Sequence, residues 1–538
     1  MKKILLLSLA LFSLLRVAAA NYYVDAAKGK DSNNGRSPQT AFRTLEPLQK
    51  VAFAAGDSIL LTGGQRHKGM LVLESVSGTA NRPIVVASRG RVKATVDGRG
   101  EPNGILVSNC NHVVVEKLHV TANCGGLPAG VKVDGRTGVL VTANRNGLFS
   151  DITVRKVDVD SVYYEEPGFS RDSQETNSPD GHGKYGWGIR VKYTGEGTQP
   201  QLDGITIADC TVTATDHTGI RFTGDKGRQI SNIRMTGNKV TYVGGPGLQG
   251  SYIRDVYIGN NTVDHSGSVT DSRNWKRGSG LWVWGADNVL VEHNSFTNAN
   301  GPADSAGAHI DFGCFNVIYQ YNFSAHNAGG FCEILGNDYN CAYRYNVSVN
   351  DGYRVAGENG ARQEGKYFWL SGFIGSKTRR FGPFNSYFYN NTIYVKSEIQ
   401  AKVSIANTSA GAMLVNNIFY IEGDAVTVHD DQNKTETKDA VARNINIRNN
   451  IFLHKGSWPT DNEAQDIQPI FGDPKFVKAG GMKITDYIPS NRELVNRGIL
   501  IPLIPGDSIG LALGLRVDRD ILGRPIKGNP TIGAIQVE

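Results

Sequence analysis

Two acidic residues, Asp311 and Glu333, lie 22 residues apart in GAHIDFGCFNVIYQYNFSAHNAGGFCEIL, the segment that covers residues 307–335. Cleavage of a glycosidic bond uses two carboxyl groups, one protonated to assist the leaving oxygen and the other ionised. If 22 residues make one coil of a parallel β-helix, the two side chains stack on adjacent strands about 4.8 Å apart. Retaining glycosidases hold their carboxyl groups about 5–5.5 Å apart. The spacing therefore predicts a pair in which like-charge repulsion raises one pKa and separates the two roles.

A short unit, apolar-x-apolar-x-x-Asn-x-apolar, recurs through the chain and supports the coil. Its asparagines are 23 to 45 residues apart, and the longer gaps are explained by loops inserted at the same turn. A short strand, a turn asparagine and a second short strand describe one rung of a solenoid, which is stable only when several rungs stack. We interpret these asparagines as an inward, structural amide ladder. They are Asn238, Asn261, Asn294, Asn322, Asn346, Asn391, Asn417 and Asn450.

A second strand, which often follows a glycine, carries polar residues to the outer face. Glu333 and Gln249 each lie 11 residues after a ladder asparagine, which gives them the same place in the coil. Asp311 lies 17 residues after its asparagine, which fits if a loop of about six extra residues precedes it. Apolar residues alternate with His309 and Asp311, so both polar side chains are expected to face outward. In the alternative interpretation, Asp311 and Glu333 are ordinary solvated residues of an exposed sheet.

Other polar and aromatic residues are expected near the pair. Aromatic faces stack on sugar rings, and arginines can hold a carboxylate or sulfate of an acidic sugar. The arginines could instead pair with neighbouring acids such as Asp216, and the histidine could be an ordinary surface residue. Insertions at 164–187 and 266–279 are expected to build groove walls. The predicted substrate-binding residues are His309, Arg190, Arg221, Gln249, Trp282, Trp284 and Asp304.

The composition and the chain ends favour an all-β fold: a single-stranded right-handed parallel β-helix with capping segments at both ends. Sixty-four glycines and 20% charged residues are typical of turn-rich β structure rather than helix bundles. The segment YYVDAAKGKDSNNGRSP and the closing DILGRPIKGNPTIGAIQVE resemble the ends of secreted, pectin-lyase-like β-helix proteins. The expected regions are 1–20 as signal peptide, 21–100 as N-terminal cap and first coils, 101–455 as β-helix with loop insertions, and 456–538 as C-terminal coils and cap.

Within that superfamily, the block Ile310-Asp311-Phe312-Gly313-Cys314-x-Asn316, followed by Glu333, resembles β-helix glycoside hydrolases of the β-xylosidase branch. The resemblance implies that Asp311 is the nucleophile and Glu333 the general acid/base. It is a local pattern and does not extend over the whole chain.

The N-terminus predicts export, to the periplasm or the medium. Lys2 and Lys3 precede the apolar run 4–15, and alanines 18–20 form a small-residue cleavage site. Beyond this segment the excess of basic residues is small and forms no block, so no nucleic-acid partner is expected. We expect a monomer without a transmembrane segment in the mature chain. The six cysteines are spread widely, either as buried thiols, the favoured interpretation, or as disulfides.

Two other functions stay open at this point. A polysaccharide lyase acting on a uronic-acid polymer would use a basic residue to remove a proton, with Ca²⁺ or basic side chains neutralising the carboxylate. A non-catalytic glycan-binding protein would need aligned aromatic residues without a coupled acid pair. For the favoured hydrolase no metal or other cofactor is expected, whereas Ca²⁺ would be possible for a lyase.

Overall fold

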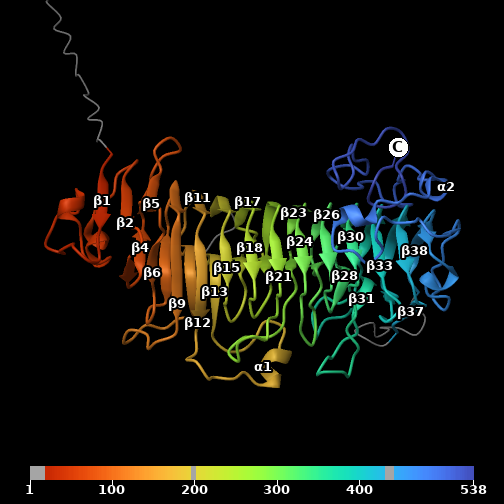
Figure 1. Cartoon of the computed structure of the whole chain (residues 1–538), viewed down its shortest axis with the longest axis horizontal. Helices are drawn as coiled ribbons and strands as arrows, with labels where there is room; N and C mark the ends of the chain where they lie inside the picture. The colour runs from red at the N-terminus through yellow and green to blue at the C-terminus, as the bar shows by residue number, and fades with distance from the viewer. Residues whose placement is uncertain (1–18, 196–200, 430–440, 538) are drawn as a thin grey trace, which may run out of the picture.

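The computed structural model describes residues 19–195, 201–429 and 441–537. Three long parallel sheets run the length of an elongated molecule, and the chain visits them in turn, so that from β2 to β39 neighbouring strands of a sheet are three apart in chain order (Figure 1). This is the predicted parallel β-helix. Residues 1–18 of the predicted signal peptide lie outside the described residues.

Sheet A, as we name it, has fourteen described strands. They are β1 (Asn21–Val24), β2 (Ser58–Thr62), β5 (Ile84–Arg89), β8 (Val113–Glu116), β11 (Phe149–Arg155), β14 (Leu202–Ala208), β17 (Ile230–Thr236), β20 (Ile253–Gly259), β23 (Asp287–Glu292), β26 (Phe315–Gln320), β29 (Ala342–Arg344), β32 (Phe384–Tyr389), β35 (Ala410–Val415) and β38 (Arg443–Arg448).

Sheet B also has fourteen described strands. They are β3 (Arg66–Lys68), β6 (Ala94–Asp97), β9 (Leu118–Asn123), β12 (Asp158–Tyr163), β15 (Thr211–Thr213), β18 (Lys239–Thr241), β21 (Thr262–Asp264), β24 (Ser295–Thr297), β27 (Phe323–Ala325), β30 (Val347–Val349), β33 (Thr392–Val395), β36 (Ile418–Ile421), β39 (Ile451–Phe452) and β40 (Ile470–Phe471).

Sheet C has twelve described strands and carries both members of the predicted acid pair. The strands are β4 (Leu71–Glu74), β7 (Asn103–Ser108), β10 (Gly135–Ala143), β13 (Tyr185–Tyr193), β16 (Ile220–Thr223), β19 (Leu248–Ser251), β22 (Leu281–Trp284), β25 (Ala308–Ile310), β28 (Gly330–Ile334), β31 (Lys366–Leu370), β34 (Lys402–Ile405) and β37 (Val426–Thr427).

Helical structure is sparse in the described residues. It consists of α1 (Ser173–Asn177) and α2 (Arg492–Val495) with the 3₁₀ turns η1 (Pro38–Thr40), η2 (Glu46–Lys50), η3 (Lys455–Ser457) and η4 (Ile484–Tyr487). No helix among these residues has the length and apolar character needed to cross a membrane.

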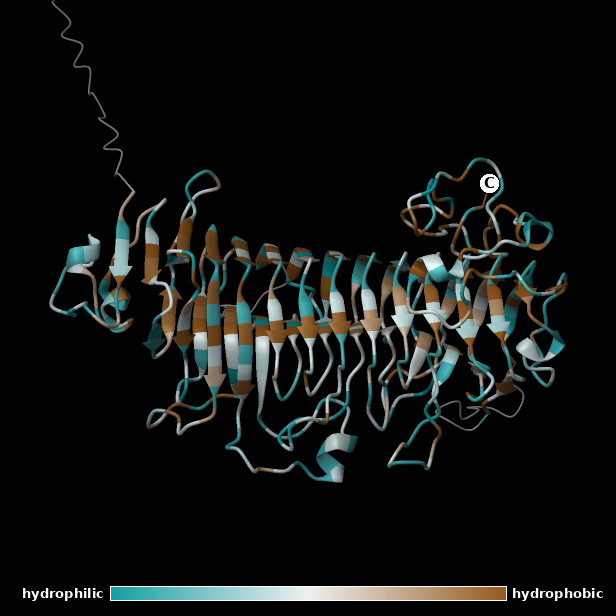
Figure 2. Ribbon diagram, viewed as in Figure 1, coloured by the Kyte–Doolittle hydropathy of each residue, from teal (hydrophilic) through white to brown (hydrophobic). Residues whose placement is uncertain are grey.

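The core is a column of stacked apolar side chains between the sheets, visible as the hydrophobic bands of Figure 2. On sheet C, for example, Val139, Ile189, Ile220, Leu248 and Leu281 follow one another in register on successive strands and are fully buried. Branched aliphatic residues suit this position because they pack well on a pleated surface. All six cysteines are buried and free, as the favoured interpretation predicted.

The asparagine ladder is confirmed by an unbroken chain of hydrogen bonds. Asn322 shows the pattern: its Nδ2 donates to Asn346 Oδ1 at 3.1 Å and to the Val291 carbonyl at 2.9 Å. Its Oδ1 accepts from the backbone N–H of Asn294 at 3.0 Å and from Asn294 Nδ2 at 2.9 Å. Asp466 Oδ2 accepts the last bonds, from Asn450. The ladder therefore satisfies buried polar groups at the same turn of every rung that it joins.

The C-terminal segment differs from the simple end cap that was expected. Residues 504–535 fold back along the outside of the helix and cover apolar side chains on the outer faces of sheets A and B. Tyr321 Oη donates to the Arg519 carbonyl and Tyr389 Oη to the Leu515 carbonyl, each at 2.8 Å. The physical reason is that outward residues such as Tyr387 and Met413 are apolar and need a cover.

We predict that Asn322→Ala lowers the midpoint of urea unfolding strongly, because it removes the amide that Asn294 and Asn346 both contact. Each buried polar group left without a partner costs about 1–3 kcal/mol. Asn146→Ala, at an exposed position, is the matched control and should leave the midpoint unchanged. Equal midpoints for Asn322→Ala and the parent protein would contradict a stabilising role for the ladder.

Candidate active site

The register of sheet C corrects one prediction about the acid pair. Ile310 pairs with Ile334, so Glu333 lies beside His309, whereas Asp311 comes after the end of β25. The predicted loop before this strand was two residues too long, and the two acids are offset by two positions. The outward row on successive strands is Arg190, Arg221, Gln249, Trp282, His309, Glu333 and Trp369.

Asp311 and Glu333 nevertheless belong to one electrostatic cluster. A rung step of about 4.8 Å combined with two residues along the strand separates their Cα atoms by roughly 8 Å. The charge of Asp304 raises the pKa of both Asp311 and Glu333, and Asp311 also raises the pKa of Glu333, while both Asp311 and Glu333 are only 6% exposed. The interpretation of the pair as solvated surface residues is therefore wrong.

Asp311 is held between an indole and the backbone. Trp282 Nε1 donates to its Oδ2 at 2.6 Å, and the Phe312 N–H donates to its Oδ1 at 2.9 Å. Burial raises the pKa of Asp311 to about 7, with a further rise from the charge of Asp304, while both hydrogen bonds oppose the rise. At neutral pH this carboxyl group can therefore either give or take a proton.

Asp304 is the ionised member of the cluster. Arg277 donates to its Oδ2 from Nε at 2.8 Å and contacts the same oxygen with Nη2 at 2.7 Å. Burial alone would raise the pKa of Asp304, but Arg277 outweighs it and the pKa is lowered. Asp304 was predicted as a substrate-binding residue in a loop. Its side chain is 19% exposed, and its charge acts on both other acids.

Glu333 is the second acid of the cluster whose pKa is raised. Burial raises its pKa well above the ordinary value, and the charge of Asp304 adds to the rise. Lys366 and Arg354 oppose it without cancelling it. The Lys366 ammonium lies 3.9 Å from the centre of the Trp369 ring, and Arg354 Nη1 donates to the Asp304 carbonyl at 3.0 Å.

His309 is buried and neutral, which excludes the interpretation of an ordinary surface histidine. Its pKa is lowered to about 4 by burial, although the charge of Asp304 favours the protonated form. Its Nδ1 lies 2.9 Å from Ser279 Oγ, and its ring packs 5.5 Å from the ring of Trp282. His309 therefore supports Trp282, which in turn binds Asp311.

The two insertions, which were predicted to be groove walls, are bonded to each other, and the second contacts Asp304 through Arg277. Trp275 Nε1 donates to the Glu175 carbonyl at 3.1 Å, which joins the insertion at 266–279 to α1. Arg277 Nη1 also donates to the Asn177 and Ser178 carbonyls, at 3.0 and 2.9 Å. Arg277, which keeps Asp304 ionised, is thus held in place by the first insertion, a loop that begins several rungs earlier in the β-helix.

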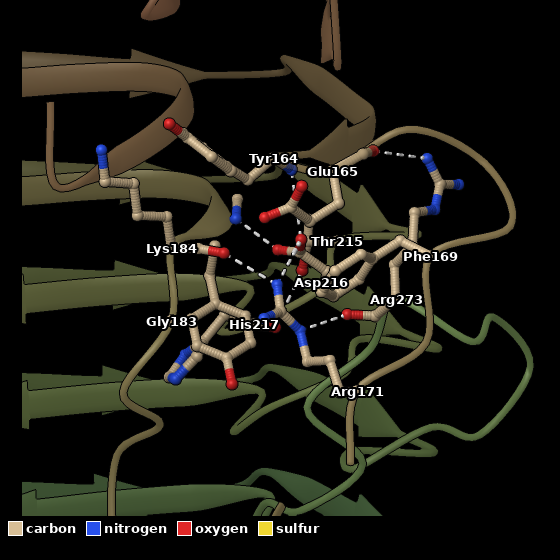
Figure 3. A network of polar contacts seen from close by, with 12 residues as sticks. Tyr164, Glu165, Phe169, Arg171, Gly183, Lys184, Thr215, Asp216, His217 and Arg273 are labelled. Atoms are coloured by element: carbon tan, nitrogen blue, oxygen red, sulfur yellow. Dashed lines mark hydrogen bonds and ion pairs between the residues drawn. The ribbon is translucent and has the colours of Figure 1, made fainter. Parts of the chain in front are cut away.

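A buried ion pair anchors this wall (Figure 3). Asp216, fully buried, accepts from the N–H groups of Tyr164 and Gly186, and Arg171 Nη2 lies 3.4 Å from its Oδ2. Arg171 also donates to the carbonyls of Lys184 and Arg273, at 2.7 and 2.6 Å. Burial raises the pKa of Asp216 to about 7 despite Arg171. These bonds tie both ends of the first insertion to the second.

The structure spreads the remaining predicted residues along the row. Arg221 makes a two-pronged ion pair with Asp180 at 2.9 and 3.1 Å, and Arg190 contacts Asp134 at 3.1 Å. Both arginines therefore contact an acid, as the alternative described, although Asp216 binds Arg171 instead. Substrate binding by Arg190 and Arg221 stays a prediction. Gln249 is fully buried, with Oε1 accepting from Thr218 Oγ1 at 3.2 Å.

Trp284 is half-buried and packs 5.2 Å from the ring of Trp282. Two cations near the acids were not predicted in their present roles. Arg277 had been assigned to a wall and, in the lyase alternative, to the basic residues that could serve the reaction. Lys366, which starts the strand one rung after Glu333, had not been considered. The only sequence signal for Lys366 was its place in that next strand. Across the described residues, no group of three or more His, Cys, Asp or Glu side chains is arranged to hold a metal ion.

We predict that Asp311→Asn raises the melting temperature by a few degrees at pH 8 and leaves it nearly unchanged at pH 4. The pKa of Asp311 is about 7 in the fold, against an ordinary value of 3.8. The folded state therefore binds a proton that the unfolded chain releases, and the associated stability is lost as the pH rises from 3.8 through 7. Asparagine removes that loss. Calorimetry at both pH values tests this, with the exposed Glu398→Gln as control. An equal shift at both pH values would be incompatible with a buried, protonated Asp311.

Comparisons with known proteins agree with the fold. A family model described as a right-handed β-helix region matches residues 187–364. Lacto-N-biosidase of Bifidobacterium longum subsp. longum is 22% identical over 96% of this chain and 36% of that protein. The chain thus spans about a third of the length of this curated relative.

Two crystal structures of a GH136 lacto-N-biosidase from Eubacterium ramulus are also similar. The selenomethionine derivative has a TM-score of 0.53 at 19% identity, over 74% of this chain and 68% of that one. The native protein has a TM-score of 0.51 at 18% identity, over 73% and 68%. Together with the three parallel sheets, these likenesses show that the chain has the right-handed parallel β-helix fold.

Proposed function

We propose that this chain is a glycoside hydrolase that acts on oligosaccharides or polysaccharides. The observation that carries the proposal is the cluster of Asp304, Asp311 and Glu333, in which one carboxyl group is ionised and two have raised pKa values. Glycosidic cleavage requires such a division of protonation states between neighbouring acids. The similarity to a lacto-N-biosidase over nearly the whole chain supports the same reaction class. Export, which the proposal includes, rests on the sequence of residues 1–20 alone.

In this proposal Glu333 remains the general acid, as predicted from the sequence. Its raised pKa keeps a proton available for the leaving glycosidic oxygen near neutral pH. The ionised role was first assigned to Asp311. Because Arg277 holds Asp304 ionised, we propose Asp304 as a second catalytic carboxylate, with Asp311 between the two states. Trp282 keeps Asp311 in one orientation through its Nε1 hydrogen bond.

The offset of Asp311 and Glu333 removes the spacing on which the retaining mechanism was predicted. Retention needs carboxyl groups about 5–5.5 Å apart, and inversion leaves about 6.5–9.5 Å for a water molecule. A diagonal pair whose Cα atoms lie roughly 8 Å apart fits either distance once the side chains are extended. The anomeric configuration of the first product decides between the two.

We expect the purified protein to release saturated reducing sugars from a panel of plant, algal and animal oligosaccharides. Products are separated by chromatography, and proton NMR in the first minutes records the anomer. Unsaturated ends that absorb in the ultraviolet would replace the hydrolase by the lyase considered above. Binding of a sugar without any turnover would favour a non-catalytic role.

Asp304→Asn, Asp311→Asn and Glu333→Gln are each expected to lower kcat/KM at least about 100-fold, the usual contribution of one acid or base. The matched control is Glu398→Gln, whose side chain is 72% exposed. Added azide should restore turnover of a substrate with a good leaving group in the variant that lacks the nucleophile or the acid/base of a retaining enzyme. The configuration of the glycosyl azide assigns which role was lost. Full activity in Asp304→Asn would contradict a catalytic role for Asp304 and leave only its predicted role in substrate binding.

A further inference from the structure

One cavity of the described residues lies away from the acid cluster. It has a volume of about 550 Å³ and opens over β7, β10 and β13 on the outer face of sheet C. The row of side chains that leads to the acids starts here, with Arg190. Arg190 and His309 are four rungs apart, which is about 19 Å at about 4.8 Å per rung. The lining residues that the argument uses are Lys132, Asp134, Leu140, Arg190 and Lys192.

The charges of this cavity are unbalanced. Three cationic side chains line it, those of Lys132, Arg190 and Lys192, against the single carboxylate of Asp134. Lys192 Nζ lies 2.7 Å and Arg190 Nη1 3.1 Å from the same oxygen, Asp134 Oδ2. The Asp134 side chain is 56% exposed. One loop carboxylate thus compensates two cations through one oxygen, from a position that solvent reaches.

Arg190 is built rigidly into the floor. Its guanidinium lies 4.1 Å from the centre of the Trp187 ring, and its side chain is only 8% exposed. The Trp187 ring packs so closely on Gly135 that a Cβ there would lie 2.1 Å from it. Arg190 Nε is buried and has no hydrogen-bond partner in the described structure. The fold therefore holds a preorganised donor whose hydrogen-bonding capacity is not used up.

A second arginine increases the demand for negative charge. Arg221 pairs in register with Arg190 on the next strand and is itself occupied by Asp180. Burial lowers the pKa of Arg190 to about 10, and the charge of Arg221 contributes. An additional anion beside Arg190 would offset both the cost of burying its charge and the repulsion from Arg221.

We propose that this basic cavity is a binding site for an anionic sugar residue, with the carboxylate or sulfate ester of the sugar taking the place of Asp134. Arg190 and Lys192 would hold the acidic group, and Leu140 offers an apolar surface to the ring. The site uses none of the reacting acids. That its ligand is a saccharide rests on the proposed function, whereas its preference for an anion rests on the charges of the cavity.

Isothermal titration calorimetry at low salt tests the proposal with three oligosaccharides of equal length. One is neutral, one carries a uronic-acid carboxylate and one a sulfate ester. We expect at least one acidic ligand to bind at least tenfold more tightly than the neutral one. The acidic ligand that binds more tightly shows whether the site prefers a carboxylate or a sulfate ester. Sodium sulfate alone is titrated as well, and binding of sulfate without either acidic saccharide would overturn the saccharide site.

Two variants with opposite expected effects sharpen the test. Lys192→Met should weaken binding of the acidic ligand at least tenfold. Asp134→Asn should tighten it several-fold, because the competing carboxylate is gone. Lys226→Met, at an exposed lysine between sheets C and A, is the control and should change nothing. Thermal melts confirm folding. Equal affinity for neutral and acidic ligands, or no response to either cavity variant, would overturn the proposal.

The binding assay and the turnover assay can fail separately. A protein that binds acidic saccharides through Lys192 but hydrolyses none would refute the proposed function and leave the cavity's role intact. A protein that hydrolyses oligosaccharides but shows no preference for acidic ones would do the reverse.

Discussion

The stacking of one coil on the next is the constraint on which every other feature depends. Parallel pairing fixes the distance between rungs, and the amide ladder from Asn238 to Asn450 fixes their rotation, because each side chain bonds to the next asparagine and to the backbone inside the turn. A residue two positions along a strand therefore has a defined place relative to the neighbouring rungs. Catalytic chemistry needs such positional precision, and a scaffold that repeats one geometry supplies it without mobile loops.

The acid cluster works against this stability. Asp304, Asp311 and Glu333 are withdrawn from water close to one another, and Asp304 has a direct ion-pair partner in Arg277. Burying like-charged groups is unfavourable. Asp311 and Glu333 therefore have raised pKa values, which favour their uncharged forms. The walls tolerate this because their own anchor, Arg171 with Asp216, lies in a separate, well-bonded network.

The sequence was a good guide wherever a feature repeats and a poor one wherever it occurs once. The ladder, the coil and the buried cysteines follow from patterns present in many rungs. The register of Asp311 was misjudged because the length of a single loop decides it, and no repeat constrains that loop. The ionisation of Asp304 by Arg277 joins two loops across 27 residues. Such contacts have no local signature.

The folded-back C-terminal segment affects the order in which parts of the molecule can fold. In an ordinary solenoid each repeat contacts only its neighbours, so rungs can assemble as they are synthesised. Here the outer faces around Tyr321 and Tyr389 are covered by residues near 515–519, which are synthesised well after the rungs that they cover. A chain truncated before that segment would present an aromatic, adhesive surface beside the very rungs that carry the acids. The cover thereby makes the packing of the middle rungs depend on a segment that follows Tyr321 by 198 residues and Tyr389 by 126.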